Sequence, residues 1–249
     1  MKSIIFAFYQ LTRLPLPCVT FEEKSCGRST AFFPAVGLIL GLILAMLALG
    51  AQWCFPDQVR AALIVSSLVI LTGGIHLDGF MDSIDGLFSG RSRERKLEIM
   101  RDSRVGAFGV IGVICLLLAK YTLLLGLPGK VFTPVLIAVP ALSRWCMVIA
   151  VTTFPYARPE GLGKIYNDRA GKIELLAATL IAALVAGISL NLLGAWLFFT
   201  GGAFTCLACR RITRELGGMT GDTYGFINEI TEVILLAAVY PYLKLSVGM

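Results

Sequence analysis

Charged residues are scarce in this sequence. Asp, Glu, Lys and Arg make up 15% of its 249 residues, and hydrophobic residues make up 57%. Soluble domains carry about 25% charged residues. Several apolar runs here reach roughly 20 residues, the length of helix that spans a bilayer. The shortage of charge therefore excludes a soluble globular protein, and the apolar runs predict an all-α, polytopic integral membrane helical bundle.

Histidine is also scarce, and the cysteines do not form the two pairs that a zinc site needs. His76 is the only histidine, and Cys206 and Cys209 form the only CxxC among seven cysteines. A structural zinc site needs four ligands, which this pair cannot supply alone. An odd number of cysteines in or near apolar runs is not typical of a disulfide framework either. We interpret the cysteines as small packing residues.

The apolar runs predict about seven spans, preceded by an amphipathic interfacial helix within residues 1–17. Polar segments on one side of these spans hold nearly all Lys and Arg residues, and only Arg60, Lys130 and Lys244 fall on the other. By the positive-inside rule, the N-terminus is cytoplasmic and the C-terminus is outside. The net charge of +6 then reflects orientation and not nucleic-acid binding. The expected spans are 31–51, 59–77, 107–126, 131–152, 173–190, 192–209 and 229–246.

Three aspartates follow directly after the second predicted span, at helical spacing. Asp78, Asp82 and Asp85 stand four and three residues apart, so a helix would place them on one face. Like charges this close repel one another unless a cation lies among them, and hard oxygen ligands suit Mg²⁺. The pattern predicts a divalent-metal site, with a solvated acidic helix end as the alternative. His76 is expected either to bind substrate or to be a hydrogen-bonded structural residue.

A basic segment follows the aspartates. Arg101 and Arg104 flank Asp102 in the segment EIMRDSRVG, and guanidinium groups bind phosphate oxygens bidentately. We therefore expect these arginines to bind a phosphoryl group, with Asp102 as a further ligand or as a group that orients an arginine. The alternative is a cytoplasmic helix held by its own ion pairs.

Further charged residues lie in or beside the later spans. Arg144 falls within a span, where a charge is costly and needs an anionic partner in the bundle interior. That partner is a substrate phosphate, an aspartate or a structural carboxylate. The glycine-rich segment at 217–222 frees backbone N–H groups to wrap an anion beside Asp222, and Glu229 shares a helix face with Glu232. We expect Arg144, Asp222 and Glu229 to contact substrate.

Taken together, these segments resemble the cobalamin synthase (adenosylcobinamide-GDP ribazoletransferase) family. The resemblance covers most of the chain in order, and the apolar stretches between the motifs match in length. The matching pieces are FFPAVGLILG at 32–41, TGGIHLDGFMDSIDGL at 72–87, LEIMRDSRVGAFGV at 97–110, PALSRW at 140–145, PYARPEGLG at 155–163, GGMTGD at 217–222 and INEITE at 227–232.

The resemblance implies one membrane-embedded catalytic domain over 1–249, in the bacterial cytoplasmic (inner) membrane with its active face toward the cytoplasm. It implies an enzyme that joins adenosylcobinamide-GDP to α-ribazole, or to its 5′-phosphate, and releases GMP with Mg²⁺ as cofactor. Such transfers depend on in-line placement and charge neutralisation. On this interpretation Mg²⁺ is held by Asp78, Asp82 and Asp85, the leaving phosphate is stabilised by Arg101 and Arg104, and the proton is accepted by Asp82 or Asp102. Association with other B12-assembly proteins is a hypothesis, and no oligomeric state follows from the sequence.

Two other functions compete with this one. CDP-alcohol phosphotransferases also carry aspartates on a membrane helix, but their pattern has Ala-Arg where this chain has Asp82-Ser83. A cation-coupled transporter would need ionisable groups at mid-membrane depth and some repeat symmetry. On the span model the acids gather at one membrane face, and no repeat is evident, so an enzyme is favoured.

Overall fold

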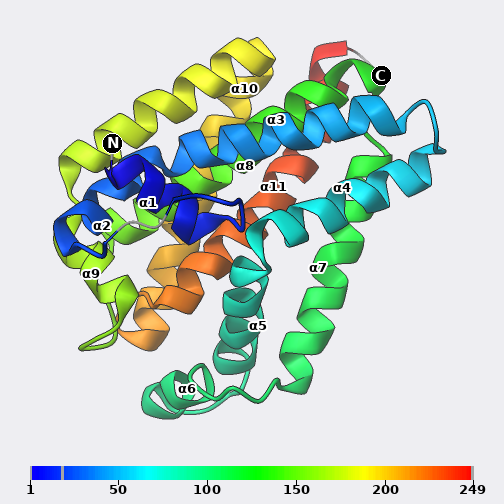
Figure 1. Cartoon of the computed structure of the whole chain (residues 1–249). Helices are drawn as coiled ribbons and strands as arrows, with labels where there is room; N and C mark the ends of the chain where they lie inside the picture. The colour runs from blue at the N-terminus through cyan, green and yellow to red at the C-terminus, as the bar shows by residue number, and fades with distance from the viewer. Residues whose placement is uncertain (1, 18–19, 248–249) are drawn as a thin grey trace.

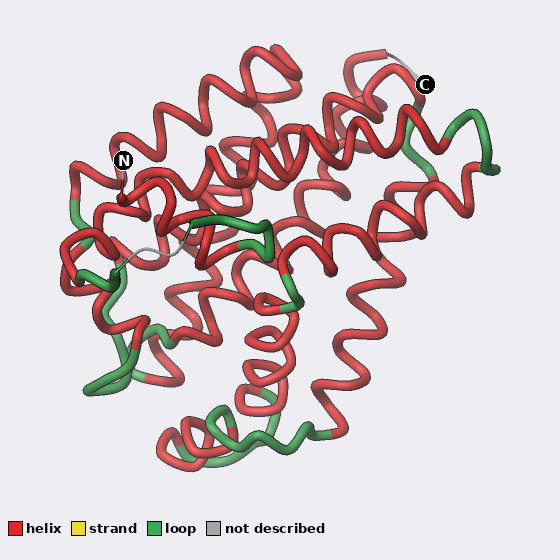
Figure 2. Tube along the Cα trace, in the orientation of Figure 1, coloured by secondary structure: helices red, strands yellow, loops and turns green. Residues whose placement is uncertain are grey.

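The computed structural model describes residues 2–17 and 20–247, and helices are the only regular elements among them (Figures 1 and 2). The all-α prediction is confirmed. In chain order the elements are α1 (Lys2–Leu11), α2 (Glu23–Ser29), the 3₁₀ helix η1 (Thr30–Phe32), α3 (Phe33–Ala51), α4 (Asp57–Thr72), α5 (Ile75–Leu87), α6 (Arg93–Ile99), α7 (Ala107–Leu125), α8 (Gly129–Thr153), α9 (Leu162–Arg169), α10 (Lys172–Leu216) and α11 (Gly221–Val247).

The membrane class is confirmed by the length and composition of the helices. Within the described residues, α4 and α5 are long and apolar enough to cross a membrane only when taken together, and this pair is bent by 92°. Helix α10 is two helices joined at Asn191, whose φ of 51° and ψ of −124° are not helical, so the predicted turn at this residue is confirmed. The predicted number of seven is reached only if the bent pair and both arms of α10 are counted as spans. Five helical stretches of the described residues are each long and apolar enough to cross a membrane: Glu23–Ala51, Ala107–Leu125, Gly129–Thr153, Lys172–Leu216 and Gly221–Ser246.

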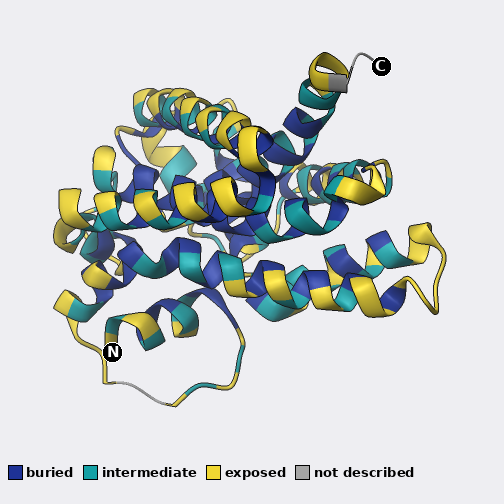
Figure 3. Cartoon of the chain, turned by 90° about the horizontal axis from the view of Figure 1, so that it is seen from above, coloured by how far each residue is buried: buried dark blue, intermediate teal, exposed yellow. Residues whose placement is uncertain are grey.

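The outer surface of the bundle is apolar. Exposed residues lie on the outward faces of the helices, while the centre of the molecule is buried (Figure 3). Monomeric soluble proteins rarely expose apolar patches larger than a few hundred Å², so this surface indicates contact with lipid. The exposed large apolar side chains include Phe108, Ile111, Ile114 and Leu118 of α7 and Leu180, Leu184, Ile188, Leu192 and Phe199 of α10.

Helix α8 is the centre around which the other helices pack. Almost every residue from Val135 to Val151 is buried, which explains why this helix reads as apolar on all sides. Helix α3 approaches α8 closely at Gly41, which has no side chain. A Cβ at this position would come within 2.6 Å of the Leu136 carbonyl oxygen. Arg144 lies in the middle of α8 and is fully buried.

A sharp break separates α4 from α5. The sequence predicted one span over 59–77, but Gly73 and Gly74 adopt φ values of 63° and 70° and end α4 in the left-handed conformation. The backbone N–H of Arg13 donates to the Leu71 carbonyl at 2.7 Å and ties the N-terminal segment to this break. As a result α5 turns away from α4 and lies alongside α7, with α6 beyond its end (Figure 1).

The N-terminal and interhelical segments also differ in detail from the prediction. The helix expected within 1–17 forms but ends at Leu11, and it packs on the bundle through Phe6, Ala7 and Leu11. The segment 153–172, which connects the predicted spans 131–152 and 173–190, contains the short helix α9. These two helices flank the region in which the predicted site residues gather.

Candidate active site

Two connected cavities form a cleft between α5, α9 and α11. The inner cavity has a volume of about 210 Å³ and the outer one about 500 Å³. They share Leu162, Gly163, Gly221 and Asp222, so the two cavities adjoin each other. His76 and Asp78 line the inner cavity, whereas arginines line the outer one.

Close packing of α5 against α11 assembles the acidic side of the cleft. A Cβ at Gly79 would come within 2.8 Å of the Asp222 carbonyl oxygen, so glycine is what allows these two backbones to touch. The packing brings Asp78 and Asp82 of α5 toward Asp222 of α11, and the charges of Asp222, Asp78 and Asp85 all act on Asp82. Residues 140 positions apart in the chain thus form one acidic group, which we call the aspartate cluster (Asp78, Asp82 and Asp222).

Asp85 does not join this cluster. Its two carboxylate oxygens accept hydrogen bonds from the backbone N–H groups of Gly106 and Gly109, each at 2.8 Å. These groups lie at the N-terminus of α7, where a carboxylate satisfies free N–H donors and complements the helix dipole. The structure therefore gives Asp85 a capping role, and this is the physical reason why the predicted trio does not converge.

No group of three or more His, Cys, Asp or Glu side chains in the described part of the chain is arranged to hold a metal ion. Mg²⁺ does not require such a group, because it commonly binds through one or two carboxylates together with waters and substrate phosphates. Within the described residues, the side-chain carboxylates of Asp78 and Asp82 take part in no hydrogen bond or ion pair, whereas those of Asp85 and Asp222 do. Their hard oxygen donors thus fit Mg²⁺, and the metal site stays a prediction.

The basic side of the cleft comes from two arginines. Arg101 and Arg158 line the outer cavity, and Arg158 forms an ion pair with Asp222 at 2.8 Å. The loop that carries Arg158 is held in place because the Ala157 N–H donates to the Met219 carbonyl at 2.7 Å. Arg158 lies in the motif PYARPEGLG, which contributed to the family resemblance but predicted no role for this arginine.

Asp102 and Arg104 lie outside the two cavities. Arg104 donates to Asp102 through Nε and Nη2 at distances of 2.7–3.2 Å, and its side chain is 88% exposed. These hydrogen bonds hold the pKa of Asp102 at about 2, below its ordinary value. The two side chains therefore satisfy each other at the surface. The alternative interpretation expected such an ion pair on a helix, but α6 ends at Ile99, before Asp102.

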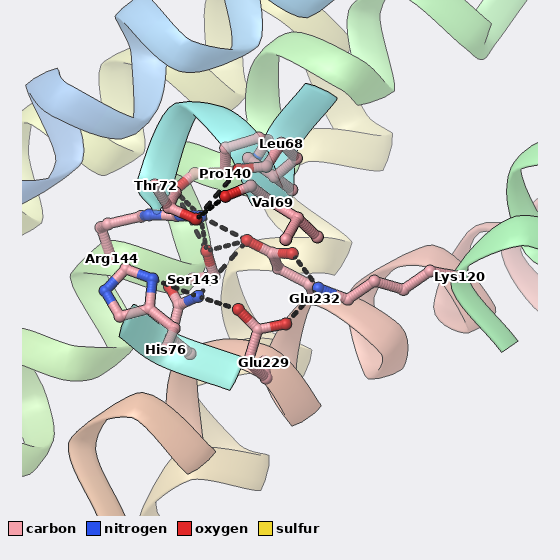
Figure 4. Close-up of polar contacts among 11 residues, drawn as sticks. Leu68, Val69, Thr72, His76, Lys120, Pro140, Ser143, Arg144, Glu229 and Glu232 are labelled. Atoms are coloured by element: carbon pink, nitrogen blue, oxygen red, sulfur yellow. Dashed lines mark hydrogen bonds and ion pairs between the residues drawn. The ribbon is translucent and has the colours of Figure 1, made fainter. Parts of the chain in front are cut away.

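A network of buried charges crosses the middle of the bundle (Figure 4). Lys120 of α7 donates to Glu229 and Glu232 of α11 at 2.5 Å each, and Arg144 of α8 pairs with Glu232 and with Ser143. The two cations and two carboxylates balance in charge, as buried ions require. Arg144 faces the interior with an anionic partner, as predicted, and that partner is a structural carboxylate. Glu229, which was expected to contact substrate, instead binds Lys120.

His76 links this network to the inner cavity. The Asn228 side-chain nitrogen lies 3.3 Å from His76 Nδ1 and 3.2 Å from a Glu229 carboxylate oxygen. His76 is buried, with 3% of its surface exposed, and it lines the inner cavity. Among the residues predicted to bind substrate, His76 and Asp222 therefore reach the cleft, whereas Arg144 and Glu229 lie in the network behind it.

Comparisons with known proteins identify the family of this chain. The family model described as cobalamin-5-phosphate synthase matches residues 3–240. The adenosylcobinamide-GDP ribazoletransferase of Desulfitobacterium hafniense is 41% identical and covers 98% of each chain. The one of Herpetosiphon aurantiacus is 39% identical over 96% of each chain, and the one of Roseiflexus sp. is 42% identical over 91% of this chain and 85% of its own.

No solved structure matches this chain. The sequence relatives nonetheless cover nearly all of it, from α1 to α11. The resemblance seen in the separate motifs is therefore confirmed over the whole length, and both rival functions fall away. The chain belongs to the cobalamin-5-phosphate synthase family.

Proposed function

We propose that this chain joins adenosylcobinamide-GDP to α-ribazole, or to α-ribazole 5′-phosphate, and releases GMP. Membership of the family makes it a transferase of cobalamin biosynthesis. The observation that carries the proposal is the cleft, which is lined by Asp78 and Asp222 of the aspartate cluster and by Arg101 and Arg158. Carboxylates beside guanidinium groups suit a reaction in which a hydroxyl attacks a diphosphate.

The bond changes follow from the substrates. The ribose 3′-hydroxyl oxygen of α-ribazole bonds to the phosphorus nearer cobinamide, and the bond from that phosphorus to the bridging oxygen breaks. GMP leaves with the bridging oxygen, and the hydroxyl proton passes to a carboxylate. Of the two candidate acceptors, Asp102 is engaged by Arg104 at the exposed surface. Asp82 lines neither cavity, but it lies close enough to Asp78, Asp222 and Arg158 for their charges to act on it, so we assign the proton to Asp82.

Arg101 and Arg158 are assigned to the diphosphate. Both line the outer cavity, and the Arg158 guanidinium now held by Asp222 would exchange this partner for phosphate oxygens. Asp78 and Asp82 would hold Mg²⁺, which supplies positive charge to the diphosphate oxygens when bound. The corrinoid would remain at the open end of the outer cavity, since the inner cavity is too small for it.

The orientation in the membrane is also a proposal. Helix α9 and the α10–α11 turn lie at the opposite end of the molecule from the α3–α4 turn (Figure 1). The basic segments around the cleft then face the cytoplasm by the positive-inside rule. We place the protein in the bacterial cytoplasmic membrane with its cleft on the inner side, where other B12-assembly proteins can meet it.

The test uses the full chain purified in detergent. With adenosylcobinamide-GDP, α-ribazole and Mg²⁺, GMP and a complete corrinoid should form in equal amounts. Asp82→Asn should remain folded and lose turnover, while the exposed Asp57→Asn serves as the matched control and keeps it. Absence of GMP from the wild-type reaction, or wild-type turnover by Asp82→Asn, would contradict the proposal or the role of Asp82, respectively.

A further inference from the structure

The inner cavity has walls suited to a flat aromatic group. Phe33, Met147, Val151, Tyr166 and Tyr224 line it, and the Phe33 and Tyr166 rings meet edge to face at 5.8 Å. Its volume of about 210 Å³ is below the ~300–1,000 Å³ of pockets that hold whole drug-sized ligands. One small ring system fits such a space.

The hydrogen bonds around His76 fix which ring nitrogen carries the proton. The Asn228 nitrogen that approaches His76 Nδ1 also donates to Glu229 at 3.2 Å. Turning the amide over would place its oxygen against that carboxylate, so the donor orientation is the stable one. Nδ1 of a neutral His76 therefore accepts a hydrogen bond, and the proton resides on Nε2.

This Nε2–H group has no partner within the described part of the protein. Nε2 is buried and makes no hydrogen bond, and in Figure 4 it points away from the network of buried charges. A buried donor left unpaired costs about 1–3 kcal/mol. A ligand in the inner cavity that offers an acceptor atom would remove this cost.

We infer that the inner cavity binds the base of the nucleoside acceptor and that His76 Nε2–H donates to the base's free ring nitrogen. The inference rests on the proposed function and deepens it. The benzimidazole of α-ribazole is flat, apolar and bicyclic, and the ring nitrogen not bonded to ribose is a hydrogen-bond acceptor. With the base in the inner cavity, the ribose lies at the junction beside Asp78 and Asp222, and the diphosphate lies in the outer cavity.

The decisive comparison uses two ribosides of the same shape. In α-ribofuranosyl indole a C–H group replaces the acceptor nitrogen of α-ribofuranosyl benzimidazole, and nothing else changes. Wild-type protein should use the benzimidazole riboside with a kcat/KM about 10–100-fold higher, as expected when a buried donor loses its partner. Equilibrium dialysis of each riboside without adenosylcobinamide-GDP should show a similar ratio of affinities.

Variants of His76 locate the discrimination. His76→Ala should bring the ratio for the two ribosides close to one, chiefly by weakening the benzimidazole riboside. His76→Gln, whose amide nitrogen stands near the place of Nε2, should restore part of the ratio. A purely structural role of His76 would lower both substrates equally and leave the ratio unchanged.

The outcomes separate this inference from the proposed function. GMP release with equal kcat/KM for both ribosides in the wild type would overturn the role of His76 and leave the reaction intact. Absence of GMP with the benzimidazole riboside and with α-ribazole would contradict the reaction itself. Equal kcat/KM in the wild type overturns the inference even if neither variant folds, and the variants separate His76 from the unpaired hydroxyls of Tyr166 and Tyr224 in the same cavity.

Discussion

Replacing Lys120 by Met should destabilise the protein by about 3–5 kcal/mol, the cost of removing one partner from a buried ion pair. Lys120 Nζ lies 2.5 Å from both Glu229 and Glu232, and all three side chains are at least 93% buried. After the substitution, Arg144 is the only cation of the network left for two carboxylates. The apolar surroundings cannot solvate the excess negative charge.

The measurement is equilibrium unfolding in mixed micelles of a mild detergent and dodecyl sulfate, followed by helical circular dichroism. A loss of 3 kcal/mol corresponds to a change of roughly 150-fold in the unfolding constant, since about 1.36 kcal/mol is tenfold. Lys130→Met, at an exposed lysine near the start of α8, is the matched control and should change stability little.

A second substitution tests the cause. Lys120→Met combined with Glu229→Gln restores the balance of charge, because Arg144 and Glu232 remain paired. The double variant should therefore be more stable than Lys120→Met alone, which a simple loss of packing by the lysine stem does not predict. Equal stability of Lys120→Met and Lys130→Met, or a double variant weaker than the single one, would refute the reasoning.

Three further predictions concern the cleft and its surroundings. Arg158→Ala should lower kcat/KM for GMP release about 10–100-fold, since hydrogen bonds to charged groups contribute about 1.5–3 kcal/mol; an effect no larger than that of the exposed Arg91→Ala would remove Arg158 from the site. Asp85→Ala should lower the melting temperature through loss of a cap worth about 0.5–2 kcal/mol, while a raised Mg²⁺ requirement would instead make Asp85 a ligand. Asp102→Asn should keep its turnover between about pH 6 and 8, because Asp102 is placed outside the cleft. The pKa of Asp102 is lowered to about 2, so any stability from its ion pair with Arg104 is fully present above the ordinary pKa of 3.8 and is lost only as the pH falls toward 2. Loss of turnover in Asp102→Asn would restore its catalytic role.

The glycines at the α4–α5 break carried a signal that the span prediction did not use. Adjacent Gly73 and Gly74 interrupt an otherwise continuous helical stretch, and their left-handed conformations turn the chain by 92°. The span predicted over 59–77 runs across these glycines, because hydropathy is averaged over a window of residues and carries no information on backbone conformation. The break matters for function, since it lets α5 pack on α11 and bring Asp78 to the cleft, with Asp82 beside it.

Composition and local pattern alone determined the class of the protein. Long apolar runs with little charge leave a bilayer as the only suitable solvent, and a lone arginine within such a run must find an anionic partner. The order of the motifs determined the family. The partners of individual side chains were decided only by the tertiary structure. Asp85 caps a helix that begins more than 20 residues later, Arg158 forms an ion pair with Asp222, and Arg144 forms one with Glu232. Helical spacing shows which residues share a face, but the packing of distant helices sets what that face meets.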